Sequence, residues 1–121
     1  MGADYKNLPL WKRGMSLAHA VYAAVEASGT KATDSGIRLR KAAVSVPSLV
    51  GEAFLDTSER DVREALALAE AKLEEVRALL TSDQAAGTIP AGDLDGLLSD
   101  LDGLRSEIAG LIEEKGRERP H

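Results

Sequence analysis

Apolar residues recur along this chain at steps of three and four, the spacing that places side chains on one face of an α-helix. The pattern predicts four amphipathic helices, over residues 8–28, 35–55, 58–80 and 93–115, joined by polar or glycine-containing connections. The alternation typical of a half-buried strand does not occur. We therefore expect an all-α protein, an antiparallel, up-down-up-down four-helix bundle that forms one domain over residues 1–121.

The first two predicted helices can each be assigned a terminal residue and an apolar face. Gly29 is expected to end the first helix, whose apolar face is Trp11, Met15, Ala18, Val21 and Val25. Asp34 or Ser35 is expected to cap the second, whose apolar face is Leu39, Ala43, Val46, Val50 and Phe54. Pro47 lies inside that second run, where a proline costs roughly 3 kcal/mol. Some packing interaction should offset this cost.

The third and fourth predicted helices carry heptad-like stripes. Asp56, Thr57 and Ser58 are suitable cap residues before the third helix, whose stripe is Val62, Leu66, Ala69, Leu73, Val76 and Leu80. Residues 81–92 are expected to form a loop, because they contain Gly87, Pro90 and Gly92. The stripe of the fourth helix is Leu94, Leu97, Leu101, Leu104, Ile108 and Leu111.

The amino-acid composition limits the kinds of catalytic and metal-binding site that the chain can form. Cysteine is absent, which excludes disulfides and thiolate sites. With His19 and His121 as the two histidines, the chain lacks the Glu-x-x-His pairs of bundle metal sites and the residues of a catalytic triad. We expect no enzyme activity, no metal, no cofactor and no small-molecule substrate. No apolar run is long enough to span a membrane or resembles a signal peptide, so a soluble, cytoplasmic protein is expected.

The formal net charge of −5 is unevenly distributed. Residues 1–50 hold seven Lys or Arg and three Asp or Glu, whereas residues 51–121 hold eight and seventeen. Either the two halves pack together and neutralise each other, or part of the basic half stays exposed for an anionic partner.

Five basic residues are candidates for binding nucleic acid: Lys12, Arg13, Arg38, Arg40 and Lys41. With aromatic residues at 3% of the chain, we expect no stacking platform for single strands, so binding would be backbone-directed and salt-sensitive. Alternatively, these cations pair with Glu52, Asp56 or the acidic fourth helix. Such pairing is the expected fate of Arg40.

The fourth predicted helix contains an internal heptad repeat with a glycine in each unit, at Gly96, Gly103 and Gly110. Each glycine costs roughly 1 kcal/mol relative to alanine inside a helix. Either the glycines are chance substitutions that the helix tolerates, or they line a groove into which another helix packs closely. In the second case a row of acidic residues would flank the groove and face the second helix: Asp93, Asp100, Glu107 and Glu114. Leu49, Leu68 and Leu98 fall beside the main stripes, where a second interface would need them. We therefore predict a homo-oligomer, with Leu49 and the three glycines at its interface.

The segment Leu39 to Ser48, LRKAAVSVPS, followed by Glu52, resembles the second helix of the bacterial four-helix-bundle family that includes the intervening-sequence protein of 23S ribosomal RNA. The opening of the first helix and Val21-Tyr22 fit as well. Leu49, Gly51 and Ala53 depart from the family pattern. The resemblance implies a homopentamer and a relation to accessory proteins of diversity-generating retroelements, which bind nucleic acid and a reverse transcriptase. The chain is thus expected to be such an RNA- or DNA-binding accessory, or alternatively a protein-only scaffold.

Overall fold

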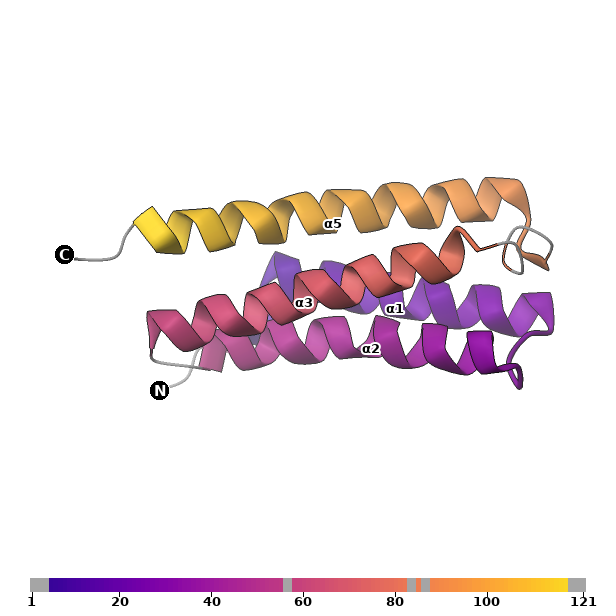
Figure 1. Cartoon of the computed structure of the whole chain (residues 1–121), viewed down its shortest axis with the longest axis horizontal. Helices are drawn as coiled ribbons and strands as arrows, with labels where there is room; N and C mark the ends of the chain where they lie inside the picture. The colour runs from indigo at the N-terminus through magenta and orange to yellow at the C-terminus, as the bar shows by residue number, and fades with distance from the viewer. Residues whose placement is uncertain (1–4, 56–57, 83–84, 86–87, 118–121) are drawn as a thin grey trace.

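A computed structural model describes residues 5–55, 58–82, 85 and 88–117. Its long helices are α1 (Pro9–Ser28), α2 (Asp34–Leu55), α3 (Glu59–Leu80) and α5 (Ala91–Arg117), and the short 3-10 helix η1 (Tyr5–Asn7) precedes them. They run alternately in opposite directions along one long axis (Figure 1), and the described residues include no strand. The predicted all-α, antiparallel four-helix bundle is confirmed.

The four helices pack as a ring. α2 lies against α1 and α3, and α5 closes the ring by lying against α3 and α1. The α1–α5 side is the most sparsely packed of the four. Because α2 and α5 lie diagonally opposite, the outer surface has a distinct α1–α2 side and a distinct α3–α5 side.

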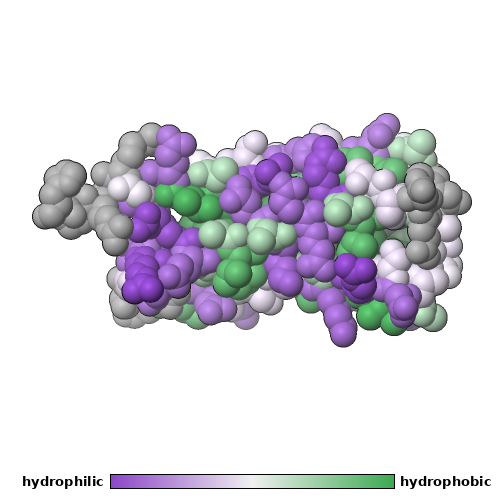
Figure 2. Space-filling model, in the orientation of Figure 1, coloured by the Kyte–Doolittle hydropathy of each residue, from purple (hydrophilic) through white to green (hydrophobic). Residues whose placement is uncertain are grey.

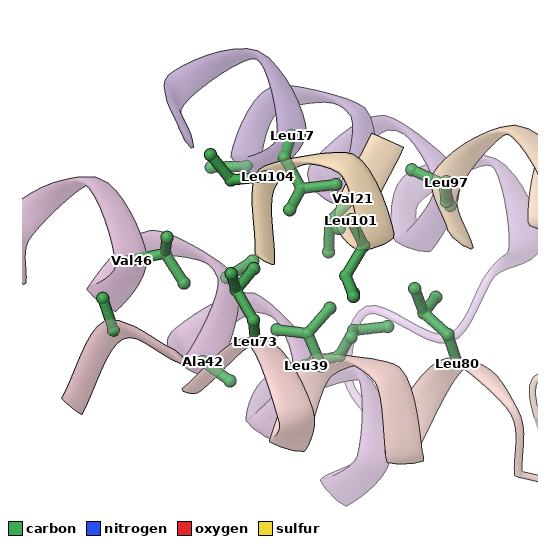
Figure 3. Close-up of a cluster of buried hydrophobic side chains, with 14 of the residues drawn as sticks. Leu17, Val21, Leu39, Ala42, Val46, Leu73, Leu80, Leu97, Leu101 and Leu104 are labelled. Carbon is green, nitrogen blue, oxygen red and sulfur yellow. The ribbon is translucent and has the colours of Figure 1, made fainter. Parts of the chain in front are cut away.

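The interior is filled by aliphatic side chains from all four helices, and Figure 3 shows leucines of α3 and α5 pointing toward residues of α1 and α2. No polar or charged residue is buried within the described part of the chain. The heptad stripes of α3 and α5 form this core as predicted, with Val62, Leu94 and Leu111 half-buried at its margin. The largest fully buried side chains include Leu66, Leu73, Leu80, Leu101, Leu104 and Ile108.

The predicted core face of α1 needs correction. Ala18, Val21 and Val25 are buried as expected, but Trp11 and Met15 are only half-buried. Leu10, Gly14 and Leu17 complete the buried face instead. α1 packs against both α2 and α5, so its buried arc is turned toward the middle of the bundle. Trp11 and Met15 are left at the outer edge of the contact with α2.

The helix ends follow capping chemistry, with one exception to the prediction. Gly29 ends α1 with φ of 73°, a left-handed conformation that glycine adopts without strain. Ser58 caps α3 by accepting a hydrogen bond from the backbone N–H of Asp61. Asp34 and Ser35 are not the cap of α2: Thr33 Oγ1 accepts from the backbone N–H of Gly36 at 3.0 Å. A threonine cap works by the same mechanism, and it lies one residue before the predicted position.

The described residues of the segment predicted as a loop over residues 81–92 are more structured than expected. The backbone N–H of Ile89 donates to the carbonyl of Ala85 at 2.8 Å, which closes a helical turn, and both side chains are buried. Gly92 lies in the first turn of α5 rather than in a loop, and Gly87 lies outside the described residues. Burial of two apolar side chains stabilises a turn that propensity alone disfavours.

Candidate nucleic-acid interface

The ring arrangement separates charge across the bundle. α1 and α2 together hold five Lys or Arg and three Asp or Glu, whereas α3 and α5 hold seven and thirteen. Figure 2 views the molecule with α3 in front, α5 along the upper edge and α2 along the lower edge, and it shows a surface that is largely hydrophilic with smaller apolar areas. The α1–α2 side is therefore a basic edge on an acidic protein.

Arg38 and Lys41 lie one helical turn apart on α2, and both are exposed. Lys12 is exposed on α1. Among the described residues, none of these three cations takes part in an ion pair. Their side chains are therefore available to an anionic partner.

Arg40 has a structural role instead. Its Nη2 donates to the backbone carbonyl of Lys31 at 2.8 Å, and its Nε donates to that of Gly36 at 3.4 Å. The guanidinium also lies over the ring of Tyr22, 5.7 Å from its centroid, a cation–π distance. Arg40 was expected to pair with a carboxylate. That expectation is wrong, because the loop between α1 and α2 brings carbonyl oxygens within its reach.

Arg13 connects the two halves of the bundle. Its Nη1 forms an ion pair with Glu107 of α5, and its Nη2 lies 2.9 Å from where a Cβ on Gly103 would stand. The acidic row of α5 thus meets α1 rather than α2, which corrects the predicted arrangement. The reason is the ring order, since α5 packs against α1 and α3. Arg13 is already paired and is less accessible to a partner than Arg38 or Lys41.

An apolar groove runs along the outside of the α1–α2 contact. One hollow of about 350 Å³ is lined by Tyr5, Trp11, Met15, Val44, Pro47, Ser48, Gly51, Glu52 and Leu55. A second hollow of about 400 Å³ is lined by Met15, Ala18, His19, Tyr22 and Val44. The two hollows share Met15 and Val44 and therefore lie next to each other along the α1–α2 contact; together they are here called the α1–α2 groove.

Sequence reasoning missed this groove because it assigned Trp11 and Met15 to the core and treated the aromatic residues as too few to matter. Three of the four, Tyr5, Trp11 and Tyr22, line the groove. The spacing of Trp11, Met15 and Tyr22 could have indicated the groove, because these residues make the apolar face of α1 wider than the part that the core can bury.

A third hollow, separate from the groove and of about 500 Å³, lies on the sparsely packed α1–α5 side. Its lining is made of small residues and two carboxylates, and it is here called the α1–α5 hollow: Ala20, Ala23, Ala24, Ala27, Gly92, Asp93, Gly96, Leu97 and Asp100. A Cβ on Gly96 or Gly110 would meet no atom within 4 Å. The repeated glycines therefore do not mark a close helix contact inside the subunit, apart from the approach of Arg13 to Gly103.

The leucines predicted to lie beside the main stripes differ in exposure. Leu68 is 55% exposed, whereas Leu49 and Leu98 are half-buried and pack against the core. Of the three leucines, Leu68 thus has the most exposed surface for a contact with another molecule.

Chemistry beyond binding has little support in the geometry. Within the residues that the structure describes, no three His, Asp or Glu side chains gather as metal ligands would. His19 lies on the exposed side of α1; His121 lies outside the described residues. None of the described helices combines the length and apolar character that crossing a lipid bilayer requires.

Comparison with known proteins bears directly on the family. A family model described as 23S rRNA-intervening sequence protein matches residues 6–110. The match includes α1, α2, α3 and most of α5, and therefore the basic edge and the lining residues of the hollows apart from Tyr5. No curated protein gives a match to the chain.

Proposed function

Because this chain belongs to the 23S rRNA-intervening sequence protein family, we propose that it is a non-catalytic, oligomeric accessory protein of the cytoplasm. Its basic α1–α2 edge binds RNA or DNA, or a nucleic-acid enzyme such as a reverse transcriptase. The observation that carries this proposal is the pair Arg38 and Lys41, which is exposed and forms no ion pair with the described residues of a protein of net charge −5. Such cations are suited to phosphate contacts.

Binding of this kind is governed by phosphate charge rather than by base identity. Each neutralised phosphate releases condensed counterions, so affinity falls steeply with salt. Arg38, Lys41 and Lys12 supply point contacts along the edge, and Arg40 and Arg13 contribute positive potential while held by their own partners. A protein of net acidity needs such concentrated cations to attract a polyanion at all.

Self-association would strengthen weak contacts by presenting several basic edges together. Support for an oligomer comes from the α1–α5 hollow, whose small residues leave room for a helix of a neighbouring subunit. Gly96, Gly103 and Gly110 follow one another along α5 at heptad spacing, and we place them, with Leu49, at the subunit interface. A homopentamer is the state expected from the family resemblance.

Two measurements test the proposal together. Light scattering after size exclusion at micromolar concentration should give a mass well above the 12.8 kDa of one chain. Titration with a mixed RNA pool should give binding at about 50 mM salt that weakens by more than tenfold at about 200 mM. A monomer would refute the assembly, and absence of RNA binding at low salt would favour the alternative, a protein-only scaffold whose charges serve solubility and subunit contacts.

A further inference from the structure

We propose that the α1–α2 groove is a docking site for an amphipathic helix of a partner protein, one that carries apolar anchors flanked by acidic side chains. This goes beyond nucleic-acid binding, because it assigns a second kind of ligand to a feature that no phosphate contact would use.

The groove concentrates exposed apolar surface. Tyr22 is 43% exposed, Val44 42% and Leu55 57%. These are three of the four large hydrophobic side chains that are exposed within the described residues. Apolar groups that gather in one hollow, rather than scatter singly over a surface, are typical of an interaction site.

The shape suits a helix. Two antiparallel helices, α1 and α2, form its walls, and the distance along α1 from Trp11 to Tyr22 is about 16 Å at 1.5 Å per residue. Roughly three turns of a partner helix fit this length. Anchors at positions i, i+4 and i+7 span about 10 Å of that length, so they would reach from the hollow beside Trp11, past Met15 and Val44, into the hollow before Tyr22.

The charges beside the groove select an acidic partner at one end. At the Tyr22 end, Arg40 lies over Tyr22 and Lys41 lies one turn before Val44, whereas Lys12 follows Trp11 at the end that Glu52 also lines. None of these cations is neutralised by a carboxylate within the described part of the chain. Glu52 lines the opposite end. The partner's acidic residues should therefore lie beside the anchor nearest Tyr22.

A second copy of this chain is a poor occupant. Of the exposed large hydrophobic residues in the described part, Leu68 of α3 is the one away from the groove, so no other described face of a second copy offers three exposed apolar anchors. Nucleic acid is also disfavoured, because aliphatic Met15 and Val44 occupy the centre of the groove. Tyr5 and Trp11 contact each other edge to face, with centroids 5.8 Å apart, so they do not form a parallel platform for bases.

The test uses Trp11, the single tryptophan of the chain, as a reporter inside the groove. A displayed library of helical peptides is selected on the full-length protein and counter-selected on Val44→Asp. The best peptide is then titrated while Trp11 emission is recorded. We expect selected peptides to share apolar residues at i, i+4 and i+7 with Asp or Glu beside one end, to shift Trp11 emission to the blue, and to bind with a micromolar Kd.

Matched variants make the result decisive. Leu55→Asp should weaken the peptide at least tenfold, whereas Leu68→Asp, at nearly equal exposure on α3, should leave its affinity unchanged. Replacing the peptide's acidic residues with lysine should abolish binding. The proposal is overturned if no peptide is selected, if the selected peptides lack acidic residues, or if Leu68→Asp weakens them as much as Leu55→Asp. It is also overturned if a single-stranded RNA oligonucleotide, or an increase in protein concentration alone, produces the Trp11 shift.

Because the groove and Arg38 lie on different parts of the α1–α2 side, the two proposals can fail separately. Arg38→Glu should leave peptide affinity within about twofold and weaken RNA, and Leu55→Asp should do the reverse.

Discussion

Gly14 of α1 lies against Pro47 of α2, so close that a Cβ built on the glycine would stand 3.4 Å from the proline Cβ. Both residues are buried. A methyl group at position 14 would make ordinary van der Waals contact with the proline ring, and the absence of a larger side chain lets the two helices pack closely there. This packing supplies the offset that Pro47 needs for its lost helical hydrogen bond.

Substitutions at Gly14 should separate the close approach from helix propensity. Gly14→Leu should lower the free energy of unfolding by about 1–3 kcal/mol, because the larger side chain overpacks the contact with Pro47. Gly14→Ala should raise it by about 0.5–1 kcal/mol, since the methyl group makes an ordinary contact with Pro47 and the helix gains propensity. Urea denaturation followed by circular dichroism measures both, and a leucine variant as stable as wild type would contradict the close approach.

The subunit interface on α5 can be tested with a bulky residue. Gly96→Leu places a side chain in the α1–α5 hollow, where the subunit itself has open space, so the single chain should stay folded while the oligomer dissociates. Ser99→Leu is the control, because Ser99 is exposed one turn away and does not line the hollow. Light scattering should give monomer for the first variant and oligomer for the second. Full assembly of Gly96→Leu would remove this glycine from the interface.

Gly103 has a different environment and a different expected outcome. Alanine at this position should gain roughly 0.5–1 kcal/mol of helix propensity but displace the Arg13 guanidinium from its place beside Glu107. Both charged side chains are more than a third exposed, and ion pairs of that kind contribute little. In the Arg13→Ala background, where no guanidinium has to move, Gly103→Ala should therefore raise the melting temperature more than it does in wild type. Equal increases in the two backgrounds would show that Arg13 does not constrain this site.

The sequence predicted the fold well because α3 and α5 obey a strict heptad rule. Leu73 and Leu101 are fully buried where their stripes require. α1 was harder, since Trp11 and Met15 continue its apolar arc past the point where α2 and α5 can both cover it. When the apolar face of a helix is wide, periodicity alone does not predict which of its edges is exposed to solvent.

The candidate site was predictable in composition but not in detail. Exposure of Arg38 and Lys41 follows from their place opposite the core stripe of α2. The fate of Arg40 depends on two carbonyl oxygens, that of Lys31 in the α1–α2 loop and that of Gly36 in the first turn of α2. The partner of Arg13 depends on which helices are neighbours in the ring. Both are tertiary relationships that a one-dimensional pattern does not contain.

The most direct test of the account is the salt dependence of RNA affinity for the double variant Arg38→Glu, Lys41→Glu. Its control is Arg60→Glu, Lys72→Glu on α3, which changes the net charge equally but leaves the basic edge intact. With helical circular dichroism preserved in both, the account predicts that the Arg38 and Lys41 variant binds RNA more weakly and flattens the log–log salt slope by about two units, about one for each lost phosphate contact. The control should keep the wild-type slope. RNA affinity and slope unchanged in the Arg38 and Lys41 variant, or reduced equally in both, would contradict binding through the basic α1–α2 edge.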